Sequence, residues 1–243
     1  MTSPVPEERR QRGALRDDEQ QPMITHHPQL DLLTEHAAGV LPLAQGACIA
    51  AHLNYCDSCA RSVAQLQQVG AAHFNAADGE PVGDAMLDRV LARLDEEPPL
   101  QYEAHRHDAK QETDAAPALL QRLMQGDFSD LPWRRVTDAL RTTLIRTGDP
   151  QFEFSLLHIA AGGEIPAHDH RGQEMTLVLQ GGFSDQNGSY HPGDFIFRQP
   201  GDQHAPRAFE GEDCICLAVV DQPLRFTGWK HRWMNPFLSL QAG

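Results

Sequence analysis

Four side chains between residues 162 and 204 constrain the fold more than any other feature of the chain. His168 and His170 lie two residues apart, Glu174 follows four residues after His170, and His204 comes from a later stretch. On a β-strand, residues two apart point to the same face, so both imidazoles can enter one interior. Three imidazoles and one carboxylate that converge form a site for a first-row transition metal such as zinc or iron. The alternative is that the two histidines are ordinary strand residues beside a loop.

The spacing of this group is similar to the first motif of the cupin family in every position. Its Gly-x5-His-x-His-x3-Glu-x6-Gly pattern is met by Gly162, His168, His170, Glu174 and Gly181. The resemblance implies a small β-barrel that binds a divalent metal, which we expect to be Zn²⁺. Strand-like alternation from residue 133 onward, with Gly and Pro at intervals of roughly 8–12 residues, agrees with a small barrel.

The second cupin motif is met less completely. Gly193 opens it, and Gly201 precedes His204 by three residues. The proline stands one place away, at Pro200, and Ala208 occupies the place of the expected Asn. This departure weakens an enzymatic interpretation more than a metal-binding one.

A second group of metal-ligand types lies in the stretch HLNYCDSC. His52, Cys56 and Cys59 have the spacing H-x3-C-x2-C. Two thiolates and one imidazole provide three of the four ligands of a structural zinc site, and a nearby helix N-terminus favours the thiolate form. His27 or its neighbour His26 is expected to supply the fourth ligand. The alternative is a redox-active CxxC pair without metal.

Apolar periodicity predicts four helices in the first part of the chain. They cover about residues 27–39, 43–54, 56–68 and 83–96. The core of such a small unit is limited, so a bound Zn²⁺ would stabilise it.

Composition divides the rest of the chain. Residues 1–22 are polar and without periodicity, which predicts a disordered tail. Residues 98–116 begin with proline and continue with polar residues, which predicts a linker. We therefore expect a two-domain α+β protein, with a zinc-binding four-helix domain over residues 23–97 and a β-barrel over residues 117–243.

The last predicted helix carries an apolar stripe that is too hydrophobic for a solitary helix in water. The stripe consists of Met86, Leu87, Val90, Leu91 and Leu94. It must pack either within its own bundle or on a partner protein, and we consider it for a partner-binding surface.

Cys214 and Cys216 form a further pair, separated by one residue in a strand-like run. On a regular strand they would face the same side, with their Cα atoms about 6.6–7 Å apart, at the limit for a disulfide. They are interpreted either as a redox pair or as two small apolar strand residues.

Charge and cysteine content narrow the function further. The chain has 243 residues, a formal net charge of −14 and five cysteines. Strong acidity disfavours direct nucleic-acid binding, whereas it suits a basic protein partner. There is no apolar run near the roughly 20 residues that cross a bilayer and no secretory signal pattern, so we expect a cytoplasmic protein without membrane association.

Taken together, the two halves resemble a known family. The H-x3-C-x2-C motif with an upstream histidine is similar to the zinc-binding anti-sigma domain, and in that comparison His27 fits the upstream position. Combined with the cupin motif, the chain resembles the ChrR-type anti-sigma factors over about residues 23–230. A paired CxC also occurs in such proteins, which favours the redox interpretation of Cys214 and Cys216.

This resemblance implies a regulator without catalytic activity. It would bind and inhibit an extracytoplasmic-function (ECF) sigma factor of group IV, and release it when the cupin half senses singlet oxygen or related oxidants. The main alternative is a cupin metalloenzyme of the dioxygenase or isomerase type, which would need an open metal position and a substrate pocket. A redox-regulated adaptor for another protein is a third interpretation.

Overall fold

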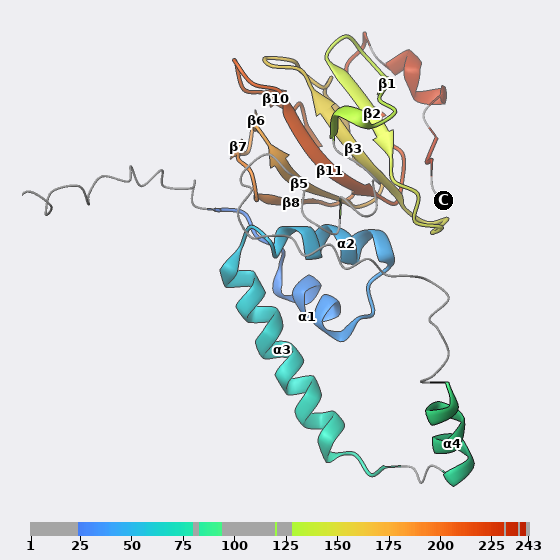
Figure 1. The fold of residues 1–243 in the computed structure, drawn as a ribbon. Coiled ribbons are helices and arrows are strands. Elements are labelled where there is room, and N and C mark those ends of the chain that lie inside the picture. The colour runs from blue at the N-terminus through green and yellow to red at the C-terminus, as the bar shows by residue number, and fades with distance from the viewer. Residues whose placement is uncertain are drawn as a thin grey trace, which may run out of the picture.

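The computed structural model describes residues 24–79, 83–93, 120, 128–230, 232–237 and 239–241. Helices occupy the first part of the chain and strands the second, as Figure 1 shows. This order confirms the predicted α+β fold class. The predicted tail (1–22) and linker (98–116) lie outside the described residues. None of the described helices is both long enough and apolar enough to span a lipid bilayer.

Four helices form where the apolar periodicity predicts them. They are α1 (Leu30–Ala38), α2 (Leu43–His52), α3 (Asp57–Ala76) and α4 (Asp84–Ala92). α1 ends because Gly39 adopts a left-handed conformation, with φ 71°, and its N–H bonds back to the last turn. α3 continues to Ala76, well past its predicted end at residue 68. Its second half is exposed and has no buried apolar face, so the apolar periodicity does not indicate it.

In the described part of the chain, twelve strands form three sheets. In chain order the strands are β1 (Arg134–Arg135), β2 (Leu140–Leu144), β3 (Glu153–Ile159), β4 (His168–Asp169), β5 (Glu174–Gln180), β6 (Phe183–Asp185), β7 (Gly188–Tyr190), β8 (Phe195–Arg198), β9 (Gln203–His204), β10 (Arg207–Ala208), β11 (Cys214–Val220) and β12 (Arg225–Phe226). The main sheet has the order β1-β2-β3-β11-β5-β8, and the small sheets are β10-β6-β7 and β12-β4-β9. Short 3₁₀ helices cover Phe128–Asp130 (η1) and Arg232–Phe237 (η2).

The main sheet is buried on both faces, which explains the uninterrupted apolar runs of β5 and β11. Along β11, Cys214 and Cys216 point into the barrel interior, where they pack with Val178 of β5. The alternate residues, including Leu217, point to the opposite face and join a second apolar cluster. Alternation along a strand thus assigns one face to the barrel interior and the other to the helices.

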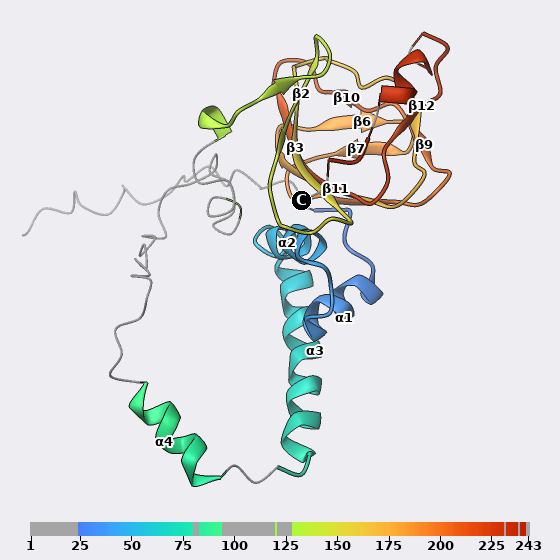
Figure 2. The same cartoon turned by 90° about the vertical axis from the view of Figure 1, so that its right-hand side faces the viewer.

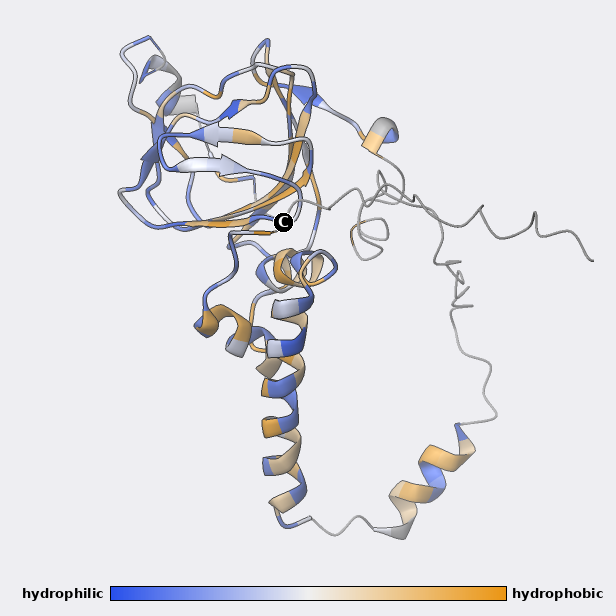
Figure 3. Ribbon diagram, turned by 90° about the vertical axis from the view of Figure 1, so that its left-hand side faces the viewer, coloured by the Kyte–Doolittle hydropathy of each residue, from blue (hydrophilic) through white to orange (hydrophobic). Residues whose placement is uncertain are grey.

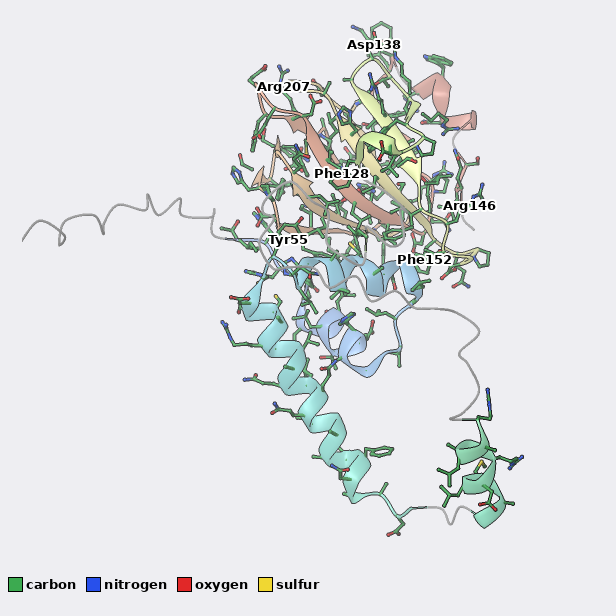
Figure 4. All side chains as sticks on the ribbon, in the orientation of Figure 1. Tyr55, Phe128, Asp138, Arg146, Phe152 and Arg207 are labelled. Atoms are coloured by element: carbon green, nitrogen blue, oxygen red, sulfur yellow. The ribbon has the colours of Figure 1, made fainter. Side chains whose placement is uncertain are left out.

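The helical part lies directly against that second face of the sheet. α2 runs beneath the barrel in Figures 1 and 2, and its buried Ala47 and Ile49 belong to the same apolar cluster as Leu177 and Leu217. Tyr55 stands at this junction in Figure 4, and its hydroxyl lies 3.5 Å from the carbonyl oxygen of Leu179. The two halves therefore share one core across their boundary.

α4 stands apart from the other three helices in both views (Figures 1 and 2). Four residues of its predicted stripe are at least half exposed: Met86 (50%), Leu87 (57%), Val90 (53%) and Leu91 (50%). Figure 3 shows the apolar colouring of this helix. For these four residues the interpretation as bundle core is wrong, and Leu94 lies outside the described residues.

The C-terminal segment carries two exposed tryptophans. Trp229 and Trp233 are 82% and 69% exposed. Phe195 is buried, and Trp133 is partly buried, donating its indole N–H to the carbonyl oxygen of Phe128.

Candidate metal centres

The first cluster gathers at the point where three helical segments meet. His27 lies on the extended segment before α1, His52 is the last residue of α2, Cys56 caps α3, and Cys59 lies in the first turn of α3. One ligand atom from each residue lies within 4.8 Å of all the others. His27 Nδ1 is 3.4 Å from Cys56 Sγ and 3.5 Å from Cys59 Sγ.

The two adjacent histidines point to different places. The ring of His26 stacks at 4.7 Å from that of Tyr190, and its Nδ1 lies 3.5 Å from Asp194. The structure therefore brings His27, and not His26, to the thiols of Cys56 and Cys59.

His52 is oriented as a metal ligand. Its Nδ1 lies 2.8 Å from the carbonyl oxygen of Gly193, which can only accept, so Nδ1 carries the proton. Nε2 is then left with a lone pair, and that atom is buried without a hydrogen-bond partner. Burial lowers the pKa of His52 to about 4, which keeps the imidazole neutral. A buried lone pair aimed at two thiols fits a bound metal ion.

The thiol groups fit the same interpretation. Cys56 Sγ accepts a hydrogen bond from the N–H of Cys59 at the start of α3, where the helix dipole favours negative charge. Burial, together with the neighbouring Cys56, raises the pKa of Cys59 to about 12. A metal must displace that proton when it binds, so affinity rises with pH. Two sulfur and two nitrogen ligands suit tetrahedral Zn²⁺.

The second cluster lies inside the barrel. β4 pairs with β9 so that His168 and His204 are directly opposite each other. His170 Nε2 is 3.1 Å from His204 Nε2, and His170 Nδ1 is 3.1 Å from Glu174 Oε2 at the start of β5. All four side chains are buried, and their ligand atoms again lie within 4.8 Å of one another.

Neighbouring groups fix the orientation of these ligands. His168 Nδ1 lies 2.9 Å from the carbonyl oxygen of Pro166, and His204 Nδ1 lies 3.1 Å from Asp185 Oδ2. Each contact places a proton on Nδ1 and turns Nε2 toward the cluster. Thr176 donates to Glu174 Oε1 at 2.7 Å, whereas the buried Oε2 faces His170 Nδ1 without a well-aligned hydrogen bond.

The charge states in the barrel also favour a cation. Burial, with His204 nearby, lowers the pKa of His168 to about 4, so this ring is neutral at physiological pH. Burial disfavours ionisation of Glu174, but the surrounding imidazoles outweigh it and hold the pKa of this carboxyl below its usual value. Three imidazoles and one carboxylate fit a divalent first-row metal, which would supply a strong positive charge at this point.

Cys214 and Cys216 lie in the same interior, with their sulfur atoms 3.5 Å apart. The pairing of β11 with β5 has an irregularity between Ile215 and Cys216, where Leu179 of β5 is the extra residue, whereas β11 keeps a regular register with β3. Both residues are buried, and the neighbouring Cys214 together with burial raises the pKa of Cys216 well above its usual value. Cys216 is therefore held as a thiol, the less reactive form.

Several contributors to the two centres are not predicted by the sequence. From the barrel half, Gly193 contacts His52 and Asp194 contacts His26, the residue before His27, whereas Asp185 orients His204. The only sequence signal is the Gly-Asp pair of the second cupin motif, which does not indicate a contact with the helices.

The fold and the two clusters define a class: a two-domain metal-binding protein in which a helical His/Cys unit is joined to a cupin barrel. A family model described as "ChrR Cupin-like domain" matches residues 121–224. The chain is 35% identical over 217 residues to "Anti-sigma-E factor ChrR" of Cereibacter sphaeroides, an alignment that covers 89% of this chain and 99% of that protein. The chain belongs to the ChrR family of anti-sigma factors.

A solved structure agrees with this assignment. The crystal structure of Rhodobacter sphaeroides SigE in complex with the anti-sigma ChrR superimposes with a TM-score of 0.70 and 33% identity, covering 82% of this chain and 100% of that one. The family is one of regulators, so the chain is a regulator and not a cupin metalloenzyme.

Proposed function

We propose that this protein binds an ECF sigma factor of group IV in a 1:1 complex, inhibits it, and releases it when the cupin half meets singlet oxygen or a related oxidant. The observation that carries the proposal is the His2Cys2 cluster at the junction of α1, α2 and α3, within a chain that aligns over nearly its whole length with an anti-sigma factor. The proposal places the complex in the cytoplasm, where transcription occurs.

The two halves have separate tasks in this proposal. The helical domain, with limits at residues 23–97, binds the sigma factor and carries a structural Zn²⁺ on His27, His52, Cys56 and Cys59. The cupin domain, residues 117–243, holds a second divalent ion, also Zn²⁺, on His168, His170, Glu174 and His204. Residues 98–116 join them. The burial of all four cupin side chains supports a sensing role, because a substrate would need room beside the metal.

α4 is the surface that we assign to the sigma factor. Its stripe of Met86, Leu87, Val90 and Leu91 is at least half exposed, and an amphipathic helix that lays its apolar face in a groove is a common recognition mode. The acidic net charge of −14 suits a partner with a basic surface.

The test uses two aspartate substitutions on the same helix. Leu91→Asp places a charge in the stripe, whereas Ala92→Asp places the same charge on the opposite side of α4, near the same end. We expect Leu91→Asp to weaken binding of the purified cognate sigma factor by at least about tenfold, the range of an interface anchor, and Ala92→Asp to change it little. Equal affinities for the two variants would contradict the assignment of α4.

A further inference from the structure

The helical metal cluster receives structural support from the barrel half of the chain. The backbone N–H groups of Thr25 and His26 both donate to Asp194 Oδ1, at 2.8 and 2.9 Å. The N–H of Phe195 donates to the carbonyl oxygen of His26 at 2.9 Å. His27, the next residue, therefore enters the cluster from a segment that is bonded to the start of β8.

Asp194 is buried and hydrogen-bonded at this position. Its side chain is only 2% exposed, and its other oxygen accepts from the N–H of His191 at 2.9 Å. Its contacts with backbone N–H groups hold its pKa below the usual value in spite of burial, so it is present as a carboxylate. A buried carboxylate that accepts two backbone N–H bonds across the domain boundary and a third within the barrel half is a rigid support.

Gly193, immediately before Asp194, orients the second ligand. Its carbonyl oxygen is the acceptor for His52 Nδ1 at 2.8 Å. A side chain here would not fit, because a Cβ would stand 2.8 Å from atoms of both Ile24 and Tyr55. Only a glycine at this position lets the barrel backbone lie this close to Ile24 and Tyr55, beside the cluster.

The other end of β8 reaches the cupin cluster. Arg198 donates to Asp185 Oδ2 at 2.8 Å and to the Tyr190 hydroxyl at 3.0 Å. The same Asp185 oxygen lies 3.1 Å from His204 Nδ1. Arg198 also pairs in register with Glu174 across β5 and β8. One short strand thus contacts the surroundings of both clusters.

We propose that the helical metal centre is a composite site, in which Asp194 is a positioning residue for His27, Gly193 fixes the tautomer of His52, and β8 connects the centre directly to the cupin centre. The positioning role stands on these contacts alone, whereas its use in releasing a sigma factor rests on the proposed function. A change at the cupin ligands reaches the helical centre through the strand, without passing through residues 98–116. Coupling of this kind is reciprocal, so metal at either centre affects the other.

The first experiment compares two aspartates in the full-length metal-loaded protein. Asp194→Ala removes the support, and Asp213→Ala is the control, because Asp213 also accepts a backbone N–H, from Ala161, but within the cupin half. Metal affinity at the helical centre is measured by chelator competition, with Co²⁺ as a probe whose sulfur-dependent absorption reports the two thiolates. We expect a loss of about 10–100-fold for Asp194→Ala, as for other residues that orient ligands, and little change for the control. Equal affinities in both variants would overturn the positioning role.

A second variant covers the case in which Asp194→Ala does not fold. Asp194→Asn keeps the shape and one acceptor oxygen, and we expect a smaller loss of affinity in the same direction. A folded Asp194→Asn protein with unchanged affinity and an unchanged Co²⁺ spectrum would also overturn the proposal.

The connection is tested by the rate at which the helical centre loses its metal to a chelator. We expect this rate to differ between protein with the cupin centre filled and protein with it emptied, and the difference to vanish in Arg198→Met, which breaks the contact with Asp185. Equal rates in the parent protein would overturn the connection. Because these readouts are metal affinities and rates, they do not depend on sigma-factor binding, which is measured separately.

Discussion

At the scale of single residues, the tautomers of the histidines decide what the clusters can bind. His52 donates from Nδ1 to a carbonyl oxygen, and His168 and His204 each have an acceptor at Nδ1. The remaining nitrogens face the clusters as lone pairs, the form in which imidazole binds metal. Spacing in the sequence identifies these residues, but only the folded contacts show which nitrogen is available.

The adjacent histidines give a direct comparison. His27→Ala removes a ligand atom that lies 3.4 Å from Cys56 Sγ, so we expect the helical centre to lose its metal to a chelator that the parent protein resists. His26→Ala removes a ring that packs on Tyr190 and leaves the ligands intact, so the metal should be retained. Metal content after chelator treatment distinguishes the two. The reverse order of loss would show that His26 is the ligand.

The buried cysteine pair leads to a second prediction. Cys216 is sealed in the barrel interior with its pKa raised, so it reacts slowly as a thiol. We expect Cys216→Ala to release its sigma factor on exposure to singlet oxygen to the same extent as the parent protein, and His168→Ala to have lost the response. The measurement is the fraction of complex dissociated after illumination with a photosensitiser. Loss of the response in Cys216→Ala would contradict this prediction and support the redox interpretation of Cys214 and Cys216.

Asp194 gives a prediction on pH. Its pKa in the folded protein lies below the ordinary value of 3.8, so ionisation stabilises the folded state above that pH, and the contribution is lost as pH falls through the folded pKa. The difference in free energy of unfolding between the parent protein and Asp194→Asn should be constant near neutral pH and shrink below about 3.8. Urea unfolding of both proteins across this range measures it. A difference that grows with acidity would have the wrong sign.

At the scale of elements, β8 and the turn before it matter most. Gly193 has φ 92°, and Gly211 has φ 94°, but no atom lies within 4 Å of the position that a Cβ at Gly211 would take. Alanine at either site incurs backbone strain of about 1–3 kcal/mol. Only Gly193→Ala must also displace Ile24 and Tyr55, which adds about 1–3 kcal/mol of overpacking.

We therefore expect Gly193→Ala to be the less stable of the two variants and to bind metal more weakly at the helical centre. The free energy of unfolding and the metal affinity are measured on both proteins. Equal stability of Gly193→Ala and Gly211→Ala would mean that the close approach between barrel and helices does not constrain the chain.

The elements that the sequence predicts well are those with a continuous apolar pattern. β5 and β11 are evident because both of their faces are buried, and α1 because Gly39 ends it. β4 and β9, which carry His168 and His204, have two residues each and no periodicity, so only the ligand spacing indicates them. The contact of Asp194 with Thr25 joins residues 169 positions apart, and no local pattern could indicate it.

At the scale of the whole molecule, the two halves share a core and are joined through β8. The sequence predicts two domains with a linker and leaves open whether they touch. Apolar residues of α2 could have been buried within the helical unit alone, so the sequence does not show that the barrel covers them. The structure shows that the two halves are in contact.

We propose that this chain is a metal-dependent inhibitor of a sigma factor. The most direct measurement is to capture the tagged protein from its host without oxygen, identify what accompanies it, and count the metal ions per chain. We predict one sigma factor and two metal ions for each chain, with the sigma factor absent when His52 or Cys56 is replaced. Capture of the metal-loaded protein without a sigma factor, or a sigma factor retained by both variants, would contradict the account.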